Sequence, residues 1–489
     1  MKVLLISANT DTISMPTLPL GAAGVAAATR NAGHEVVLLN LMFEADPSAS
    51  LMHALEHFCP DAIGISVRNI DDQNMAEPRF LLAPVKEVIA SCRSLSEAPI
   101  VLGGAGYSIF PQSALDYLCA DLGIQGEGEV VFPLLLDRIG KAREVSDLPG
   151  VHLPGPNVRA VGPDTVRLCH SERSEESRLG SKLVKGQGDQ SKIPRSARND
   201  TYRQGADAGV ARDTSAESLR PLREPRRREF VENLDELPLP EPGLWVPPGA
   251  GQRQLWVPVQ SRRGCPLDCT YCSTSLIEGR GTRRRSPAQV AKWVALLRET
   301  GCRNFNFVDN TFNLPLDYAK DLCRHLVQAE LDLHIWCIIY PKWIDRELVE
   351  LMRRAGCRRI SFGFESGSDP MLRSLGKQFD REEISAVSKM FAEAEIERMG
   401  FLLLGGPGES KDSVEESLAF ADSLRLEALK ITVGLRIYPH TPLAKTALAE
   451  GLIRADEDLL VPRFYLRPGL KDWLPERVAT YKASRPWVN

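Results

Sequence analysis

Short apolar runs alternate with helical stretches along about the first 140 residues. Each run is too short for a helix and is followed by small or polar residues, whereas 21–31 has helical spacing of its apolar positions. Strands that alternate with helices in this way form a doubly wound parallel sheet. The runs that predict strands are 3–7, 35–39, 61–66 and 100–104.

A second series of strand and helix patterns occupies the carboxyl-terminal half. The first predicted strand is 255–260, a helix is predicted over 287–300, and three later strands, at 302–310, 359–365 and 400–404, end in polar residues or lead into glycines. The span from Leu255 to about Leu452 is too short for eight strand–helix units of usual length. We therefore expect a partial barrel of about six units, open at one side, with an aromatic-rich tail as a cap.

The composition changes sharply between these halves. Residues 167–229 hold 15 Lys and Arg against 10 Asp and Glu, with a single aromatic residue. Such a stretch buries too little apolar surface to offset its ordering entropy, which predicts a disordered insertion. A nucleic-acid-binding arm is the alternative, but interleaved aromatic residues are absent. The expected domains are 1–145, a linker over 146–250, a barrel over 251–452 and a cap over 453–489.

Composition and charge agree with a large soluble enzyme. The chain has 489 residues, 43% hydrophobic content and a net charge of -4, which gives no general reason to expect nucleic acid as a partner. No apolar run reaches the roughly twenty residues of a membrane-spanning helix. The first residues lack the apolar core and cleavage site of a signal peptide. We expect a cytoplasmic location, where the eleven cysteines stay reduced.

Three cysteines lie close together in the run Arg-Arg-Gly-Cys-Pro-Leu-Asp-Cys-Thr-Tyr-Cys, at Cys265, Cys269 and Cys272. A structural zinc site and an ordinary ferredoxin site each need four protein ligands, and the local count stops at three. Later cysteines occur singly within apolar patterns. The spacing therefore favours a loop that holds three irons of a 4Fe-4S cluster and leaves the fourth iron open.

This loop, with Tyr271 before its last cysteine, resembles that of the radical S-adenosylmethionine (SAM) superfamily. The resemblance implies that SAM chelates the open iron and is cleaved to a 5′-deoxyadenosyl radical. It further implies SAM contacts at Asp309, at Glu365, and at Gly405 and Gly406, and it places 435–443 as the last barrel strand, near the adenine. Each feature also has a plainer interpretation: a solvated strand end, an Asx turn or a helix-start loop.

The amino-terminal region resembles the cobalamin-binding domain that precedes the barrel in one large radical SAM class. The resemblance implies that Ser66, Gly103 and Gly104 line the slot for the nucleotide tail of the corrinoid. The cobalt-ligating motif Asp-x-His-x-x-Gly is missing, since residues 7–11 contain no histidine. The alternative is a vestigial Rossmann-like domain that only docks on the barrel.

The resemblance implies a cobalamin-dependent methyltransferase that acts on an unactivated carbon of a lipid or natural-product-like small molecule. An external electron donor, flavodoxin or ferredoxin, would reduce the cluster. A radical cyclase, rearrangement or C–C coupling enzyme without net methyl transfer is the alternative among enzymes. A non-catalytic iron–sulfur or corrinoid carrier is the alternative from another class. A methylthiotransferase is less attractive, because the amino-terminal domain offers no second set of three cysteines.

Overall fold

Two parallel sheets, each with its own helices, make up the computed structural model of this chain, which describes residues 1–11, 16–155 and 228–488. The predicted insertion over 167–229 lies outside the described residues, apart from its last two positions. The described residues all belong to one compact unit. Contacts between the two sheets are therefore contacts within one unit.

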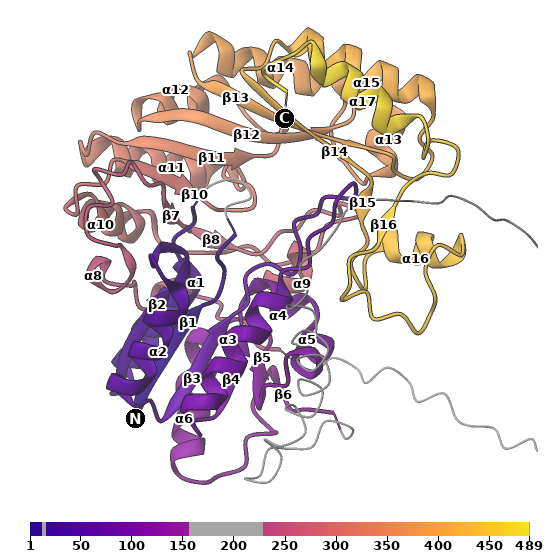
Figure 1. Cartoon of the computed structure of the whole chain (residues 1–489). Helices are drawn as coiled ribbons and strands as arrows, with labels where there is room; N and C mark the ends of the chain where they lie inside the picture. Colours follow the sequence, from indigo (N-terminus) through magenta and orange to yellow (C-terminus); the bar gives the residue numbers. More distant parts are fainter. Residues whose placement is uncertain (12–15, 156–227, 489) are drawn as a thin grey trace, which may run out of the picture. The chain divides into compact units, whose positions relative to one another are not determined.

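The first sheet has the strand order β2-β1-β3-β4-β5-β6 (Figure 1). Its strands are β1 (Lys2–Ser7), β2 (Glu35–Asn40), β3 (Ala62–Ser66), β4 (Ile100–Gly103), β5 (Leu122–Ile124) and β6 (Val151–His152). All neighbours are parallel except β5 and β6. The doubly wound sheet is confirmed, and β6 extends it beyond the expected boundary at residue 145.

Helices cover both faces of this sheet because its strands are apolar on both sides. Side chains from α1 (Leu20–Asn31) and α6 (Gly128–Gly140) pack with Val3 and Leu5 on one face. On the other face, Leu4 and Ile6 pack with α2 (Pro47–Phe58), α3 (Leu82–Leu95) and α5 (Pro111–Leu118). The short helix α4 (Ala105–Ile109) follows β4 directly.

The second sheet contains six strands in the order β14-β13-β12-β11-β10-β7, and every neighbouring pair is parallel. Its strands are β7 (Val257–Val259), β10 (Asn304–Phe307), β11 (His334–Ile339), β12 (Cys357–Glu365), β13 (Glu397–Leu404) and β14 (Ala428–Val433). The helices α10 (Pro287–Arg298), α11 (Leu316–Gln328), α12 (Arg346–Arg354), α14 (Arg381–Glu393) and α15 (Lys411–Leu424) contact one another in chain order along it (Figure 1). The predicted six-stranded partial barrel is confirmed.

The strand expected over 435–443 is wrong in its placement. The last barrel strand is β14, and Leu435 and Arg436 form a two-residue strand, β15, which pairs antiparallel with β16 (Phe464–Tyr465). Gly434 separates β14 from β15 with a φ of +76°, a conformation that ends a strand and that glycine adopts without steric cost. The residues after Arg436 are irregular until α16 (Pro442–Ala449).

Alternate residues of the barrel strands face opposite sides. Phe305, Cys337 and Phe362 belong to the buried core beneath the helices. Most of the intervening positions face the barrel interior and stay partly exposed, with Ile338 at 40%, although Ser361 is only 2% exposed. The period of two in the sequence therefore separates a packed outer layer from an interior wall that stays partly accessible in the described part of the chain.

The flanking segments complete the barrel core. Trp245, in the short helix α8 (Pro242–Trp245), stacks beside Trp293 of α10, so part of the expected linker belongs to the barrel. At the other end, α17 (Leu474–Ala483) buries Leu474, Val478 and Tyr481 in the same core. The plainer interpretation of the tail aromatics, core packing, fits Tyr465 and Tyr481. A cap over the barrel opening stays a prediction.

Candidate cofactor sites

The cysteine loop is held at both ends by a small hairpin. Its strands β8 (Arg262–Arg263) and β9 (Arg283–Arg284) pair antiparallel, and α9 (Thr274–Glu278) lies between them. Gly264 turns the chain into the loop with a φ of +87°, and a Cβ there would lie 1.9 Å from the Gly281 carbonyl oxygen. The amide of Cys265 donates to the Gly279 carbonyl. These contacts therefore fix the backbone position of Cys265.

The three thiols suit a cluster better than a single ion. All three side chains are partly exposed, and the amide of Cys272 donates to the carbonyl of Cys269. Burial, with a smaller contribution from the other two thiols, raises the pKa of Cys265 to about 11. Within the described residues, no three His, Cys, Asp or Glu side chains meet as one ion requires. A cubane takes each thiolate on a separate iron, so it does not need the three thiols to meet at one point.

A buried cluster of charged and aromatic groups lies beside this loop. The Tyr271 hydroxyl donates to Glu365 Oε1 at 2.8 Å, and the Lys377 ammonium lies 3.2 Å from the same oxygen. The side chains of Lys377 and Glu365 are 5% and 9% exposed. The pKa of Lys377 is raised well above its usual value: burial alone would lower it, but Tyr271, Glu365 and Cys269 outweigh that effect.

Lys377 is the site residue that sequence reasoning missed. It follows α13 (Asp369–Ser374) in a short Leu-Gly-Lys turn, without a motif of its own. Glu365 was predicted, and its φ of +60° at the end of β12 turns its carboxylate toward Tyr271. A residue other than glycine with positive φ is uncommon, and such positions concentrate at functional sites.

The glycine turn after β13 leads into α15 as expected. Gly405 has a φ of +97°, and its amide and that of Gly406 both donate to Glu409 Oε2. Burial raises the pKa of Glu409 to about 7 although these two bonds lower it. A Cβ at Gly406 would meet Leu375, Met371 and Leu435 at ordinary contact distances. Local packing therefore does not require glycine at position 406, since a Cβ would fit there.

Asp309 does not present its carboxylate to a cofactor. Its side chain is fully buried, and its two oxygens accept bonds from the Ser261 amide and hydroxyl and from the Arg262 amide, at 2.6–3.0 Å. Arg262 lies 3.5 Å away as an ion partner. Since these donors occupy both oxygens, Asp309 fixes the chain between β7 and the cysteine loop, and its expected direct contact with SAM is corrected.

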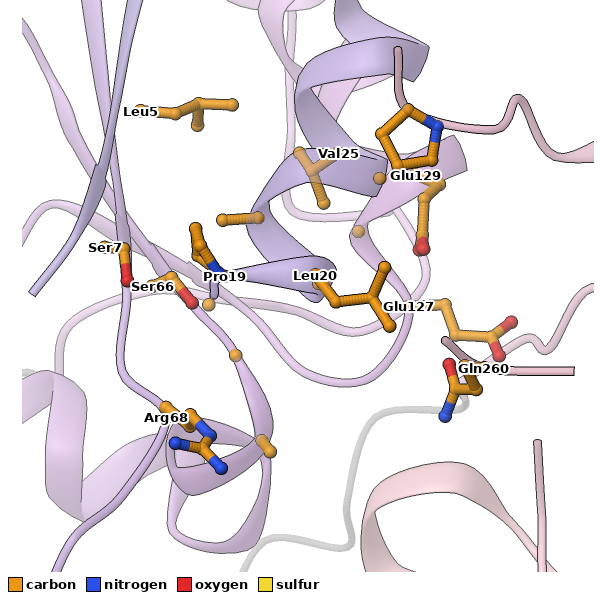
Figure 2. A pocket seen from close by; sticks show the side chains of 18 of the residues that line it. Leu5, Ser7, Pro19, Leu20, Val25, Ser66, Arg68, Glu127, Glu129 and Gln260 are labelled. Atoms are coloured by element: carbon orange, nitrogen blue, oxygen red, sulfur yellow. The ribbon is translucent and has the colours of Figure 1, made fainter. Parts of the chain in front are cut away.

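A pocket opens at the carboxyl edge of the first sheet. It has a volume of about 340 Å³ and is lined by Ser66, Gly103 and Gly104, as expected for the corrinoid slot, and by Arg263 of the barrel hairpin. Figure 2 shows Ser66 and Gln260 in its wall. A Cβ at Gly64 would lie 2.4 Å from the Leu5 side chain, and one at Gly104 would lie 2.6 Å from the Val67 carbonyl. Small residues are thus required for packing as well as for space.

The pocket suits a corrinoid tail without a protein histidine. Its wall is mostly apolar, with Arg68 and Glu127 among its charged residues (Figure 2). Among the described residues that line it, none is histidine. Burial lowers the pKa of Arg68. The missing histidine motif in the sequence therefore corresponds to a pocket with no imidazole to offer to cobalt.

A loop of the first domain reaches the barrel near these sites. Between β3 and α3, Asp71 accepts a hydrogen bond from Arg436 Nε at 2.8 Å, and the two side chains are 1% and 2% exposed. Four residues later, Met75 packs on the backbone of Gly434, where a Cβ would lie 2.3 Å from its sulfur. The loop therefore joins the corrinoid domain to the end of the last barrel strand.

Known proteins resemble the chain in both halves. Residues 6–136 match the B12 binding domain, and residues 259–421 match the Radical SAM superfamily. An uncharacterized methyltransferase of Pyrococcus horikoshii is 24% identical over 93% of this chain and 84% of its own length. The tryptophan 2-C-methyltransferase of Streptomyces laurentii is 25% identical over 90% of this chain and 74% of its own length.

Solved structures share the whole architecture. The radical SAM methyltransferase TsrM from Kitasatospora setae, with cobalamin and a 4Fe-4S cluster bound, matches with a TM-score of 0.75 at 20% identity, over 100% of this chain and 90% of its own. The cobalamin-dependent radical enzyme OxsB, with aqua-cobalamin and SAM bound, matches at 0.69 and 14% identity, over 99% of this chain and 66% of its own. Separately, no helix in the described ranges is long and apolar enough to cross a membrane.

The cofactors expected from the sequence, a 4Fe-4S cluster, SAM and cobalamin, are those bound in these similar structures. A cysteine loop that suits a cluster and a small-residue pocket at a doubly wound sheet match the two family descriptions in the same order along the chain. The chain therefore carries a Radical SAM superfamily domain preceded by a B12 binding domain, the arrangement of a cobalamin-dependent radical SAM enzyme.

Proposed function

We propose that this enzyme is a cobalamin-dependent methyltransferase that acts on an unactivated carbon of a lipid or natural-product-like small molecule. The observation that carries the proposal is the presence, within one compact unit, of a cysteine loop suited to a cluster and a pocket suited to a corrinoid, with the barrel hairpin contributing to both. A methylating enzyme needs both cofactors close to one substrate.

The residues of the cysteine loop and of the adjacent ionic cluster have different roles. Cys265, Cys269 and Cys272 would hold the cluster. When bound, the cluster and SAM supply a carbon radical that abstracts hydrogen, and cobalamin supplies a transferable methyl group. The Lys377 ammonium suits the carboxylate of SAM, and the Glu365 carboxylate suits a hydroxyl or amino group. Both side chains are buried, which excludes water from a region where a reactive radical must be protected.

The barrel interior supports an apolar substrate. Trp336, Ile338, Phe401 and Leu403 occupy the inward positions of β11 and β13, and all stay partly exposed while the outward positions are buried. The indole N–H of Trp336 donates to the Ser361 hydroxyl at 2.8 Å, so this ring presents mainly apolar surface. Apolar walls with few polar groups suit a hydrophobic ring or chain.

Relatives of this chain support methyl transfer to small molecules. One acts on tryptophan, and another is named cytidylyl-2-hydroxyethylphosphonate methyltransferase, from Streptomyces wedmorensis. These substrates differ widely in charge and shape. They favour the reaction type for this chain and leave the substrate to be identified from its own interior wall.

The test is anaerobic reconstitution with iron, sulfide, hydroxocobalamin and SAM carrying a labelled methyl group, with flavodoxin or ferredoxin as the electron donor. Extracts of the cells in which this protein naturally occurs supply candidate substrates. We expect labelled methyl in an extract component, together with S-adenosylhomocysteine, and loss of both in Cys269→Ala. Release of 5′-deoxyadenosine without methyl transfer would instead indicate a rearrangement or coupling enzyme. Bound cofactors without SAM turnover would indicate a carrier and overturn the proposal.

A further inference from the structure

A buried ionic network joins the corrinoid pocket to the cysteine loop. Arg263, which lies two residues before Cys265, donates to Glu129 Oε1 at 2.6 Å and lies 3.2 Å from Glu127 Oε1. Both glutamates come from the start of α6 in the first domain, and both line the pocket, as does Arg263. The side chains of Arg263, Glu127 and Glu129 are 15%, 7% and 5% exposed.

The network continues from Arg263 into the cysteine loop. Arg263 Nε donates to Gln260 Oε1 at 3.0 Å, and Gln260 Nε2 donates to Glu278 Oε1 at 2.9 Å. The other oxygen of Glu278 accepts the amide of Gly264 at 3.0 Å, and Gly264 is bonded directly to Cys265 in the chain. Hydrogen bonds thus connect the wall of the corrinoid pocket to the residue that precedes the first cluster ligand without a break.

A second arm holds the same helix start independently. Arg283, in the other strand of the hairpin, donates to Glu127 Oε1 at 2.6 Å and to the Val231 carbonyl at 3.0 Å. Its side chain is 5% exposed. Because Arg283 keeps Glu127 anchored, loss of Arg263 alone should leave α6 docked on the barrel. Arg263 can therefore be tested without separating the two domains.

The ion pairs of Arg263 are buried, and burying charged groups costs free energy. Ion pairs out of water gain little net stability over apolar contacts, whereas removing one partner is strongly unfavourable. Simple packing between the domains would not require such a network. A guanidinium does, however, fix the direction of its carboxylate and amide partners through its planar fork. The distances of 2.6–3.2 Å around Arg263 leave little freedom between α6 and the cysteine loop.

We propose that Arg263 is a positioning residue that sets the corrinoid pocket relative to the cluster. The inference rests on the proposed function, since it gives the two cofactors a required spacing. Arg263 acts through Glu129 on the pocket wall and through Gln260 and Glu278 on the cysteine loop. Its loss leaves each site formed but no longer fixed with respect to the other.

The test compares Arg263→Gln with a matched control in the same loop. Arg280→Gln removes an ion pair with Asp268 whose two side chains are each 63% exposed. Glu129→Gln is the second variant, because it weakens the same contact from the other domain while keeping an acceptor oxygen. If Arg263→Gln does not fold, Glu129→Gln is compared with Arg280→Gln in its place.

The first readout is amide hydrogen exchange in cluster-loaded protein without corrinoid. We expect Arg263→Gln to speed exchange both at the start of α6 and at residues 264–272, with unchanged iron content. The second readout is hydroxocobalamin binding by absorbance titration, which should weaken about tenfold, as losses of supporting contacts around a bound metal group typically do. Arg280→Gln should leave both readouts at wild-type values.

Pulsed electron paramagnetic resonance of the reduced cluster and cob(II)alamin gives the spacing directly. A single narrow distance in the wild type should broaden in Arg263→Gln. Unchanged exchange at α6, or loss of the cluster alone, would overturn the proposal, because Arg263 would then serve only the loop. If the wild type binds no corrinoid, the proposed function fails, while the exchange experiment still decides whether Arg263 couples the two regions.

Discussion

The buried ion pair between Asp71 and Arg436 should be among the most costly contacts to break in this protein. Arg436 donates to Asp71 at 2.8 Å and also to the carbonyls of Ile437 and Leu459, at 2.6 and 2.8 Å. These carbonyls solvate the guanidinium but cannot neutralise it. Asp71→Ala would leave an uncompensated charge in a site that is 2% exposed, which costs about 3–5 kcal/mol in the free energy of unfolding.

Smaller changes should give graded losses. Asp71→Asn keeps an oxygen for Arg436 and removes the charge, so we expect a loss of about 1.5–3 kcal/mol. Arg436→Met leaves the carboxylate unpaired and should cost about as much as Asp71→Ala. The double variant Asp71→Asn with Arg436→Met should lose less than the sum of the two single losses, because neither charge then remains buried alone.

Equilibrium urea unfolding of corrinoid-free protein, followed by tryptophan fluorescence, measures these losses. The exposed pair Arg454–Asp456, with side chains 79% and 67% exposed, is the control, and Asp456→Asn should leave the free energy of unfolding close to the wild-type value, because water screens this pair. Single losses that add within about 0.5 kcal/mol in the double variant would refute the reasoning, since the two side chains would then act independently.

Three further outcomes follow from the two cofactor sites. Gly103→Val should abolish hydroxocobalamin binding without unfolding the protein, because a Cβ at Gly103 meets nothing nearer than 3.9 Å and projects into free space; absorbance titration and circular dichroism check both parts. Glu365→Gln should weaken SAM binding by about tenfold or more at unchanged iron content, measured by calorimetry, because hydrogen bonds to charged groups contribute about 1.5–3 kcal/mol. The folded-state pKa of Glu409 lies near 7, above its unfolded value of 4.5. The unfolded chain then loses this proton first, so stability should fall by up to about 3 kcal/mol as pH rises from 4.5 to 7, and Glu409→Gln should remove that part of the decline in urea titrations.

Local patterns in the sequence predicted the fold because its strands and helices are short stretches of the chain. The cluster ligands also come from one short stretch, and they stay a prediction. The cysteines lie within eight consecutive residues, and the parallel strands are short apolar runs between helices. Gly103 and Ser66 were predicted because the amino-terminal region resembles a cobalamin-binding domain, and the structure brings them together at one pocket.

Contacts between distant residues could not be predicted in this way. Arg263 and Glu129 are 134 positions apart, and Arg436 and Asp71 are 365 apart, so no spacing rule connects them. Lys377 had no signal beyond a single lysine in a turn. Asp309 misled because a strand end suggests a free side chain, whereas the neighbouring backbone at Ser261 and Arg262 occupies its oxygens.

The glycines at the edge of the first sheet have a consequence for how this lineage can change. The ligand enters this pocket because glycine has no side chain. A single codon change that places a larger residue at position 103 could therefore abolish ligand binding and leave the fold intact. At position 64 the same change would come within 2.4 Å of the Leu5 side chain and 3.1 Å of the Phe132 ring, so buried side chains would have to shift. Descendants that have abandoned the corrinoid should therefore differ first at position 103 and last at position 64.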